Sequence, residues 1–267
     1  SATLNNNGGF FPNPGLSGYE PSTPSPGPNV GPAYGYFAGG STISTVDRID
    51  YSNDSSNCVT KGSLTRTTAR QSAGAGNRDY GYIGGGGNPN GYSRVDRIDY
   101  ASDTDTAVSK GPLATSRFGL GSSGNASYGY WSAGRSDSST LHSTVDRIDY
   151  SNDTATALAR GSLTSDRRDV VSVGNLNYSY VGSGRNASTT IDLVDRIDFS
   201  NDTATAAPKG PLPADKDDLG ATGNINFGYF GGGDPASAGG SYIERIDYSN
   251  DTVNASRRGV LSASRRY

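Results

Sequence analysis

The sequence predicts an all-β propeller in which five blades of four short strands surround a common axis. Three observations predict it. A unit of about 49 residues repeats five times, each unit divides into four short strand-like segments, and no segment carries helical periodicity over two turns. Since a single unit is too short to bury its own apolar faces, neighbouring units must shield one another around a ring.

The motif VDRID, or IERID in the last copy, marks the repeat. It occurs five times, starting at Val46, Val95, Val145, Val194 and Ile243. An aromatic and glycine-rich segment such as AYGYFAGG precedes each copy, and a KG or RG turn with a leucine follows it. A basic residue stands four positions after this leucine in every unit except the first, where Thr68 occupies that place.

Each unit contains four segments with strand character. A small-residue stretch ending in GN is the first strand, the aromatic segment is the second, VDRID is the third, and the stretch before the KG or RG turn is the fourth. Gly, Asn, Asp and Pro separate them. The predicted propeller spans 33–267, with units near 33–77, 78–125, 126–175, 176–224 and 225–267.

Residues 1–32 differ from the repeats because they are rich in Pro, Gly, Asn and Ser. Proline at this density removes backbone donors and disfavours a central strand, so we predict an extended arm or linker. The alternative is an arm that docks on a neighbouring subunit, with Phe10, Phe11 and Tyr19 as its anchors. Only four first strands are evident for five units, and the missing one is expected from 28–33, from the last residues or from another chain.

The units resemble the kelch repeat. The Gly-Gly doublets carry this resemblance, together with an Ile-Asp step in place of the kelch Tyr-Asp step and an Asp-Thr turn such as Asp153-Thr154. The doublets are Gly39-Gly40, Gly84-Gly85 and Gly232-Gly233. The kelch tryptophan is missing, and the doublet is degraded at Ala133-Gly134 and Ser183-Gly184. The resemblance covers residues 33 to about 265, and it implies the propeller architecture.

The sequence motifs RIDYSNDTATA and KGPL also resemble kelch-like repeats in structural proteins of marine bacteriophages, including phages that infect cyanobacteria. This resemblance implies a virion protein: a fibre, a tail component or a capsid decoration. Its expected location is the virion, or otherwise the extracellular space or a cell surface. Its expected partners are other virion or surface proteins, contacted through the arm and the blade rims.

The VDRID strand predicts a structural role for its charged residues. Both faces of a blade contact neighbouring blades, so one arginine per blade is placed to bridge them, and the planar guanidinium suits such multidentate contacts. The predicted inter-blade residues are Arg48, Arg97, Arg147, Arg196, Arg245, Asp50, Asp99, Asp149, Asp198 and Asp247. The alternatives are an anion or sugar site on each blade, and a calcium site at turns such as Asp50 with Asp54.

Composition argues against several other classes of function. A net charge of −3 does not suggest nucleic acid or an anionic membrane as partner, and no apolar run approaches a membrane span. Cys58 is the only cysteine and His142 the only histidine, so neither a disulfide nor a usual zinc or copper-radical site can form. No nucleophile elbow occurs. We therefore expect no catalytic residue, no metal and no cofactor.

The loops between the glycine doublet and VDRID differ most among the units, which frees them for recognition. Tyr92, Trp131 and Tyr242 lie in or near these loops, where an aromatic ring beside polar groups can stack on a sugar. The sequence thus predicts a non-enzymatic structural protein that mediates protein contacts and host attachment, with a lectin-like propeller that binds a host glycan as the alternative. These aromatic residues can equally be packing residues.

Overall fold

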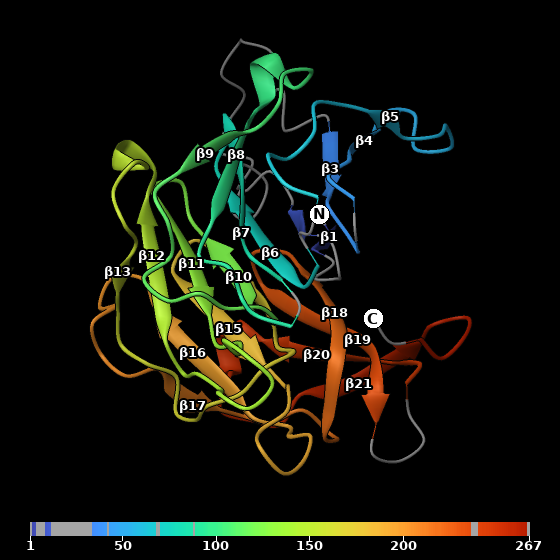
Figure 1. Cartoon of the computed structure of the whole chain (residues 1–267). Helices are drawn as coiled ribbons and strands as arrows, with labels where there is room; N and C mark the ends of the chain where they lie inside the picture. Colours follow the sequence, from blue (N-terminus) through green and yellow to red (C-terminus); the bar gives the residue numbers. More distant parts are fainter. Residues whose placement is uncertain are drawn as a thin grey trace, which may run out of the picture.

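The predicted fold class is confirmed: the chain is a five-bladed β-propeller of antiparallel four-stranded sheets. The computed structural model describes residues 2–3, 9–11, 34–41, 43–67, 70–87, 89–235 and 240–265. The blades follow one another in chain order around a common centre, and the blue first blade and the red last blade lie on the same side of the view (Figure 1). No helix in these ranges is long and apolar enough to cross a membrane.

Each of the first three blades places its strands from the axis outward in chain order. Blade I contains β2 (Gly9–Phe11), β3 (Tyr34–Ala38), β4 (Val46–Asp50) and β5 (Val59–Thr60). Blade II contains β6 (Ser72–Gly76), β7 (Tyr80–Gly85), β8 (Val95–Asp99) and β9 (Val108–Lys110). Blade III contains β10 (Gly121–Gly124), β11 (Tyr128–Ser132), β12 (Val145–Asp149) and β13 (Leu158–Ala159).

The last two blades keep this order. Blade IV contains β14 (Val171–Gly174), β15 (Tyr178–Gly182), β16 (Val194–Asp198) and β17 (Ala207–Lys209). Blade V contains β18 (Lys216–Gly223), β19 (Phe227–Pro235), β20 (Tyr242–Asp247) and β21 (Ser256–Val260), and β1 (Ala2–Thr3) pairs with β18 as a fifth strand.

The N-terminal segment supplies the first strand that the sequence left unassigned. In the described backbone, β2 pairs antiparallel with β3, and its register joins Phe10 to Phe37. This strand comes from none of the three sources expected from the sequence. The arm therefore contacts the propeller of its own chain at two places, through β2 on blade I and β1 on blade V. The side chains of Phe10 and Phe11, and all of Tyr19, lie outside the described residues.

The apolar core lies in the seams between blades. At the seam of blades I and II, Tyr36 and Leu64 pack with Ile98 and Ala107, and all four are buried. Equivalent clusters lie between blades II and III, III and IV, and IV and V. The propeller is therefore stabilised by contacts between repeats, as expected for units that cannot bury their own faces.

The two degraded glycine doublets keep the backbone of the intact ones. Ala133 and Ser183 have φ of 60° and 65°, close to the 69° of Gly85 at the equivalent position. The turn after the second strand thus requires a left-handed residue in each of these units, although such a residue costs about 1–2 kcal/mol when it is not glycine.

A close approach between blades gives a test of the seams. A Cβ on Gly161, in the connection from blade III to blade IV, would lie 1.8 Å from the carbonyl oxygen of Ala204, whereas a Cβ on Gly259, its equivalent in the last unit, would meet nothing within 4 Å. We expect Gly161→Ala to lower the free energy of unfolding by about 1–3 kcal/mol through overpacking. Gly259→Ala should leave it within about 0.5 kcal/mol. Equal effects in denaturant titrations would contradict these seams.

Candidate functional site

One carboxylate joins each pair of blades from I–II to IV–V. At the seam of blades II and III, Asp153 accepts hydrogen bonds from the Tyr82 hydroxyl at 2.9 Å and from Arg97 Nη1 at 2.8 Å. Lys110 Nζ lies 3.0 Å from its other oxygen. Asp153 belongs to the turn after the third strand of blade III, while the three donors all belong to blade II. We call this carboxylate and its donors the seam latch.

The seam latch recurs at three further seams. Its carboxylates there are Asp103, Asp202 and Asp251, which accept from Arg48 at 2.8 Å, Arg147 at 2.7 Å and Arg196 at 2.7 Å. The tyrosine donors are Tyr36, Tyr130 and Tyr180. Four of the five arginines predicted from the sequence therefore lie in inter-blade ion pairs, because their strand register places each one opposite its tyrosine.

Burial and hydrogen bonding decide the charges within the latch. Although burial opposes ionisation, hydrogen bonds from Lys110, Tyr82 and Arg97 lower the pKa of Asp153. Burial and the bonded carboxylate raise the pKa of the Tyr82 hydroxyl. At neutral pH the carboxylate is therefore ionised and the phenol remains a donor. The Arg97 guanidinium also lies 4.2 Å above the Tyr80 ring, which gives it a cation–π contact.

The aspartates predicted as inter-blade residues have a different role. Asp99 accepts a hydrogen bond from the backbone N–H of Ala101 at 2.9 Å, so it caps the turn that follows its own strand. The same cap, with a serine two residues on, occurs at Asp50, Asp149, Asp198 and Asp247. A carboxylate engaged by its own turn does not reach the neighbouring blade, and the acid four residues later makes the contact instead. This corrects the sequence-based assignment.

The basic residue after the repeat leucine forms a second set of buried pairs. Arg117 Nη2 lies 2.7 Å from Asp146 Oδ2 with both side chains fully buried. Lys216 and Glu244 form the equivalent pair in blade V at 2.8 Å. The sequence pattern identified these basic residues but not their acidic partners. The partners are the second residue of VDRID or IERID, such as Asp146, for which the sequence predicted no contact.

Arg66 takes this place in the first unit, two residues after Leu64 rather than four. Its Nη2 donates to the carbonyl oxygen of Gly85. Gly85 holds the same repeat position as Ala133, whose carbonyl oxygen accepts from Arg117. However, Arg66 makes no ion pair with Asp96, whose carboxylate instead accepts from Thr65 and lies 3.4 Å from Arg94 Nε. The Nε and Nη1 atoms of Arg66 are buried and have no hydrogen-bond partner.

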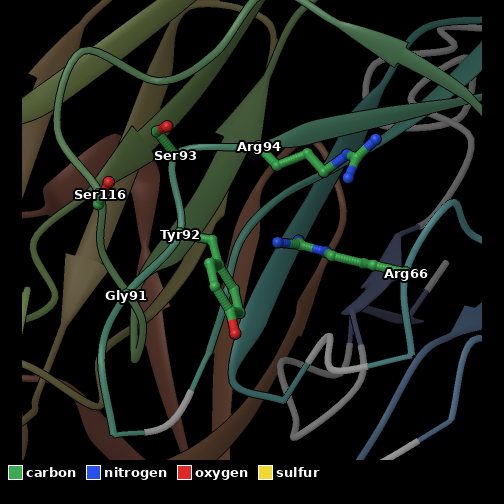
Figure 2. A pocket seen from close by; sticks show the side chains of 6 residues that line it. All are labelled: Arg66, Gly91, Tyr92, Ser93, Arg94 and Ser116. Carbon is green, nitrogen blue, oxygen red and sulfur yellow. The ribbon is translucent and has the colours of Figure 1, made fainter.

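These unpartnered atoms lie beside a pocket of about 400 Å³ lined by Arg66, Gly91, Tyr92, Ser93, Arg94 and Ser116. Figure 2 shows the Arg66 guanidinium reaching toward the Tyr92 ring, with Arg94 on the adjacent wall. The Arg66 Cζ lies 5.4 Å from the centre of that ring. Two guanidinium groups, an exposed aromatic ring and two serines line the pocket, and none of the six lining residues is acidic. This lining suits an anionic ligand rich in oxygen.

The side chains that line this pocket are not part of the repeat. Ile43, His142, Ile191 and Gly240 stand at the place of Tyr92 in the other units. Thr45, Thr144, Leu193 and Tyr242 stand at the place of Arg94. Loop variation, rather than the repeat, therefore creates this site.

The other aromatic residues predicted to bind ligand have different surroundings. Trp131 is fully buried, and its Nε1 donates to the carbonyl of Ala73 at 2.9 Å, so it packs the seam of blades II and III and is not available to a ligand. Tyr242 is half-buried, with the Arg257 guanidinium 4.1 Å from its ring. Of the three, Tyr92 alone lines the pocket, and it is 40% exposed.

A second polar cluster lies at one end of the innermost strands. Gln71, Asp169 and Asp218 lie at the start of first strands and have φ of 53–54°. The backbone N–H of Asp169 donates to the carbonyl oxygen of Gly119, and the backbone N–H of Asp218 donates to the carbonyl oxygen of Asp169. Burial, and then the nearby Asp169 and Asp217, raise the pKa of Asp218 to about 7. Within this cluster, Asp218 therefore titrates near neutrality.

No protein-family model and no curated protein matches the chain. The solved structures do contain similar folds. The fold is similar to that of YjhT. The structure titled "Structure of YjhT" aligns with a TM-score of 0.75 and 12% sequence identity, over 100% of this chain and 86% of that one. At this identity the similarity concerns the propeller architecture alone.

The latch can be tested with a matched pair of variants. Asp153→Ala removes the acceptor of Tyr82, Arg97 and Lys110 and leaves two cations unpaired, so we expect a loss of about 2–4 kcal/mol in the free energy of unfolding. Asp54 holds the same repeat position but is exposed, without a latch. Asp54→Ala should therefore change the stability by less than about 0.5 kcal/mol. Urea titrations of both variants measure this difference.

The raised pKa of Asp218 gives a pH dependence. Because its pKa is about 7 in the folded chain and 3.8 for an ordinary aspartate, the folded state binds an extra proton between these values. The stability contributed by this group therefore falls as pH rises from about 4 to 7. Asp218→Asn should remove this fall and stabilise the chain at pH 8 by on the order of 1 kcal/mol after solvent screening.

The relevant measurement is the stability difference between Asp218→Asn and wild type at pH 5 and pH 8. Asp169, Asp217 and Arg168 remain in both proteins, so the difference reports the titration of Asp218 together with its coupling to these neighbours. The exposed Asp215→Asn serves as a control for the loss of one negative charge. A difference that stays the same at both pH values would contradict the assignment.

Proposed function

We propose that this propeller is a non-enzymatic binding module whose ligand is an acidic carbohydrate. The single observation that carries the proposal is the buried, unpartnered Nε and Nη1 of Arg66 beside the exposed ring of Tyr92. Several other arginines of the described residues also bury an unpartnered Nε, but Arg66 is the one among them whose terminal Nη1 is buried without an acceptor. A buried terminal donor at a pocket favours an incoming acceptor. A sugar carboxylate supplies two such acceptor oxygens, and the pyranose face stacks on an aromatic ring.

Arg94 adds the second charge that an acidic sugar requires. Its side chain is 43% exposed, and only its Nε approaches an acid, Asp96 at 3.4 Å. Ser93 and Ser116 line the same pocket and carry hydroxyls that can both donate and accept. The residues that bind are therefore divided between the fixed Arg66, which also holds Gly85, and the more exposed Tyr92 and Arg94, which select the ligand.

The wider setting of this activity is also a proposal. On the resemblance of the repeats to structural proteins of marine bacteriophages, we propose that the propeller acts on the surface of a virion and attaches it to host glycans. A structural role among neighbouring virion proteins is compatible with the same fold, since the pocket involves only residues near Arg66, Tyr92 and Ser116 and leaves the rims of the other blades available for contacts.

Binding to immobilised polygalacturonate, with neutral dextran as the reference, tests the pocket. We expect the full chain to retain the acidic polymer selectively, with affinity that falls as salt rises. Arg94→Ala should weaken binding at least roughly tenfold, because a hydrogen bond to a charged group contributes about 1.5–3 kcal/mol. Tyr92→Ala should also weaken binding, because it removes the ring on which the sugar stacks. Ile43→Ala, at the equivalent position of the first unit, is the matched control and should bind like wild type.

Two results would exclude this function. One is equal retention on dextran and on polygalacturonate, which would remove the requirement for charge. The other is loss of binding in Ile43→Ala to the same extent as in Tyr92→Ala, which would place the ligand outside the pocket.

A further inference from the structure

The seam between the last and the first blade differs from the other four. At each of the other four seams, the turn after the third strand of one blade places an aromatic residue, an aspartate and an alanine against the preceding blade. The aromatic stacks on the latch tyrosine, as Tyr150 does on Tyr82 with 4.8 Å between ring centres. At blade I, the turn residues at these repeat positions are Tyr51, Asp54 and Cys58. The structure describes all three, and they lie at the surface.

The exposure of these residues shows that, among the residues that the structure describes, nothing covers one face of blade I. Cys58 is exposed, whereas the equivalent alanines Ala107, Ala157, Ala206 and Ala255 are 5–6% exposed. Tyr51 is 38% exposed, while Tyr150 at the same position is 9% exposed. Asp54 is exposed as well, and Ile49 is only half-buried. We call this set the incoming face.

Blade V carries the complementary uncovered face. Tyr229 is half-buried, although the latch tyrosines of the other four blades are 0–2% exposed. Arg245 stacks on Phe227 at 4.1 Å, but it forms no ion pair with a carboxylate of the described residues, and Arg258 is exposed. A Cβ on Gly259 would meet nothing within 4 Å, unlike its equivalents at the other seams. We call this set the outgoing face.

The two faces are matched in chemistry. The outgoing face offers the tyrosine, the arginine and the basic residue of a seam latch. The incoming face offers the aspartate and the aromatic residue. Arg265, at the outgoing end, is exposed. Asp47 of blade I holds the repeat position of Asp146, which is the buried ion-pair partner of Arg117. Each face therefore lacks the half of a seam that a kelch-like blade would supply.

The N-terminal strands limit the separation of these blades. β1 pairs with blade V and β2 with blade I, and five residues of chain separate the two strands. Six steps of extended chain span at most about 20 Å. Face-to-face sheets pack about 10 Å apart, so a single sheet between the inner edges of blades V and I is compatible with this limit.

We propose that the incoming and outgoing faces together bind one further four-stranded unit of the same repeat type. This unit presents an aspartate to Tyr229, Arg245 and Arg258, and it presents a tyrosine and an arginine to Asp54. A whole second copy fits the faces less well, because placing its first blade on blade V would bring its other blades into the existing ring. Direct closure of blade V on blade I would pair Arg245 with Asp54, a contact absent from the described residues.

The test adds a sixth unit to the full chain. A copy of residues 217–265 is placed directly after Arg265, where the repeat would continue in phase. A second extended protein carries a copy of residues 168–216 at the same place, so that the result does not depend on the folding of one added sequence. The only thiol, Cys58, then reports on the incoming face through its rate of reaction with a thiol reagent, with Cys58→Ala as the blank.

We expect the unextended chain to react as a free exposed thiol and an extended chain to react at least about tenfold more slowly, with a higher melting temperature. Asp54→Ala should lower the melting temperature of the extended chain as much as Asp153→Ala does, and leave that of the unextended chain unchanged. These results would support the proposal independently of any ligand at the Tyr92 pocket.

Three outcomes would overturn the proposal. Slow reaction of Cys58 in the unextended chain at all concentrations would mean that another part of the same chain already covers the incoming face. Protection that appears only at high concentration, together with a dimer in light scattering, would mean that a second copy covers the faces. Unchanged reactivity of Cys58 in both extended chains would mean that the faces accept no blade.

Discussion

The structure depends on the contact between one buried aspartate and three donors of the preceding blade. A single blade exposes both faces of its sheet, so it is stable only when its neighbours cover it. The carboxylate of Asp153 fixes the distance and rotation between two such sheets, because it has to meet the tyrosine, arginine and lysine of blade II together. The stacked aromatic residues and the buried alanines then fill the seam that this contact defines.

This use of charge engages four of the repeated arginines in contacts between blades. At the four latched seams, the repeated guanidinium is occupied on one face by an aromatic ring and at its tip by a carboxylate, as Arg97 is by Tyr80 and Asp153. Residues outside the repeat are free of this constraint. Tyr92 and Arg94 belong to a loop of variable sequence, and Arg66 is displaced by two positions from the repeat pattern, which separates its guanidinium from Asp96 and leaves two donors unpartnered.

The same regularity makes departures from it informative. Four seams are built from equivalent residues with closely similar distances, so the fifth can be compared with them atom by atom. Cys58 is exposed where four alanines are buried, and Gly259 has open space where four glycines touch the next blade. The N-terminal strands join the sheets of blades I and V at the axis, but they do not supply the outer part of a seam.

The sequence by itself determined the blade count, the strand order and the inter-blade place of the arginines, because these follow from a repeated local pattern. Only the tertiary structure decided which acid meets Arg97, since Asp149 and Asp153 share one turn and differ only in whether the side chain bonds its own backbone. It also decided that Gly9–Phe11 completes blade I, that Trp131 is buried, and that Arg66 reaches Tyr92. These contacts join residues far apart in the chain, and their free energy depends on geometry that no local pattern encodes.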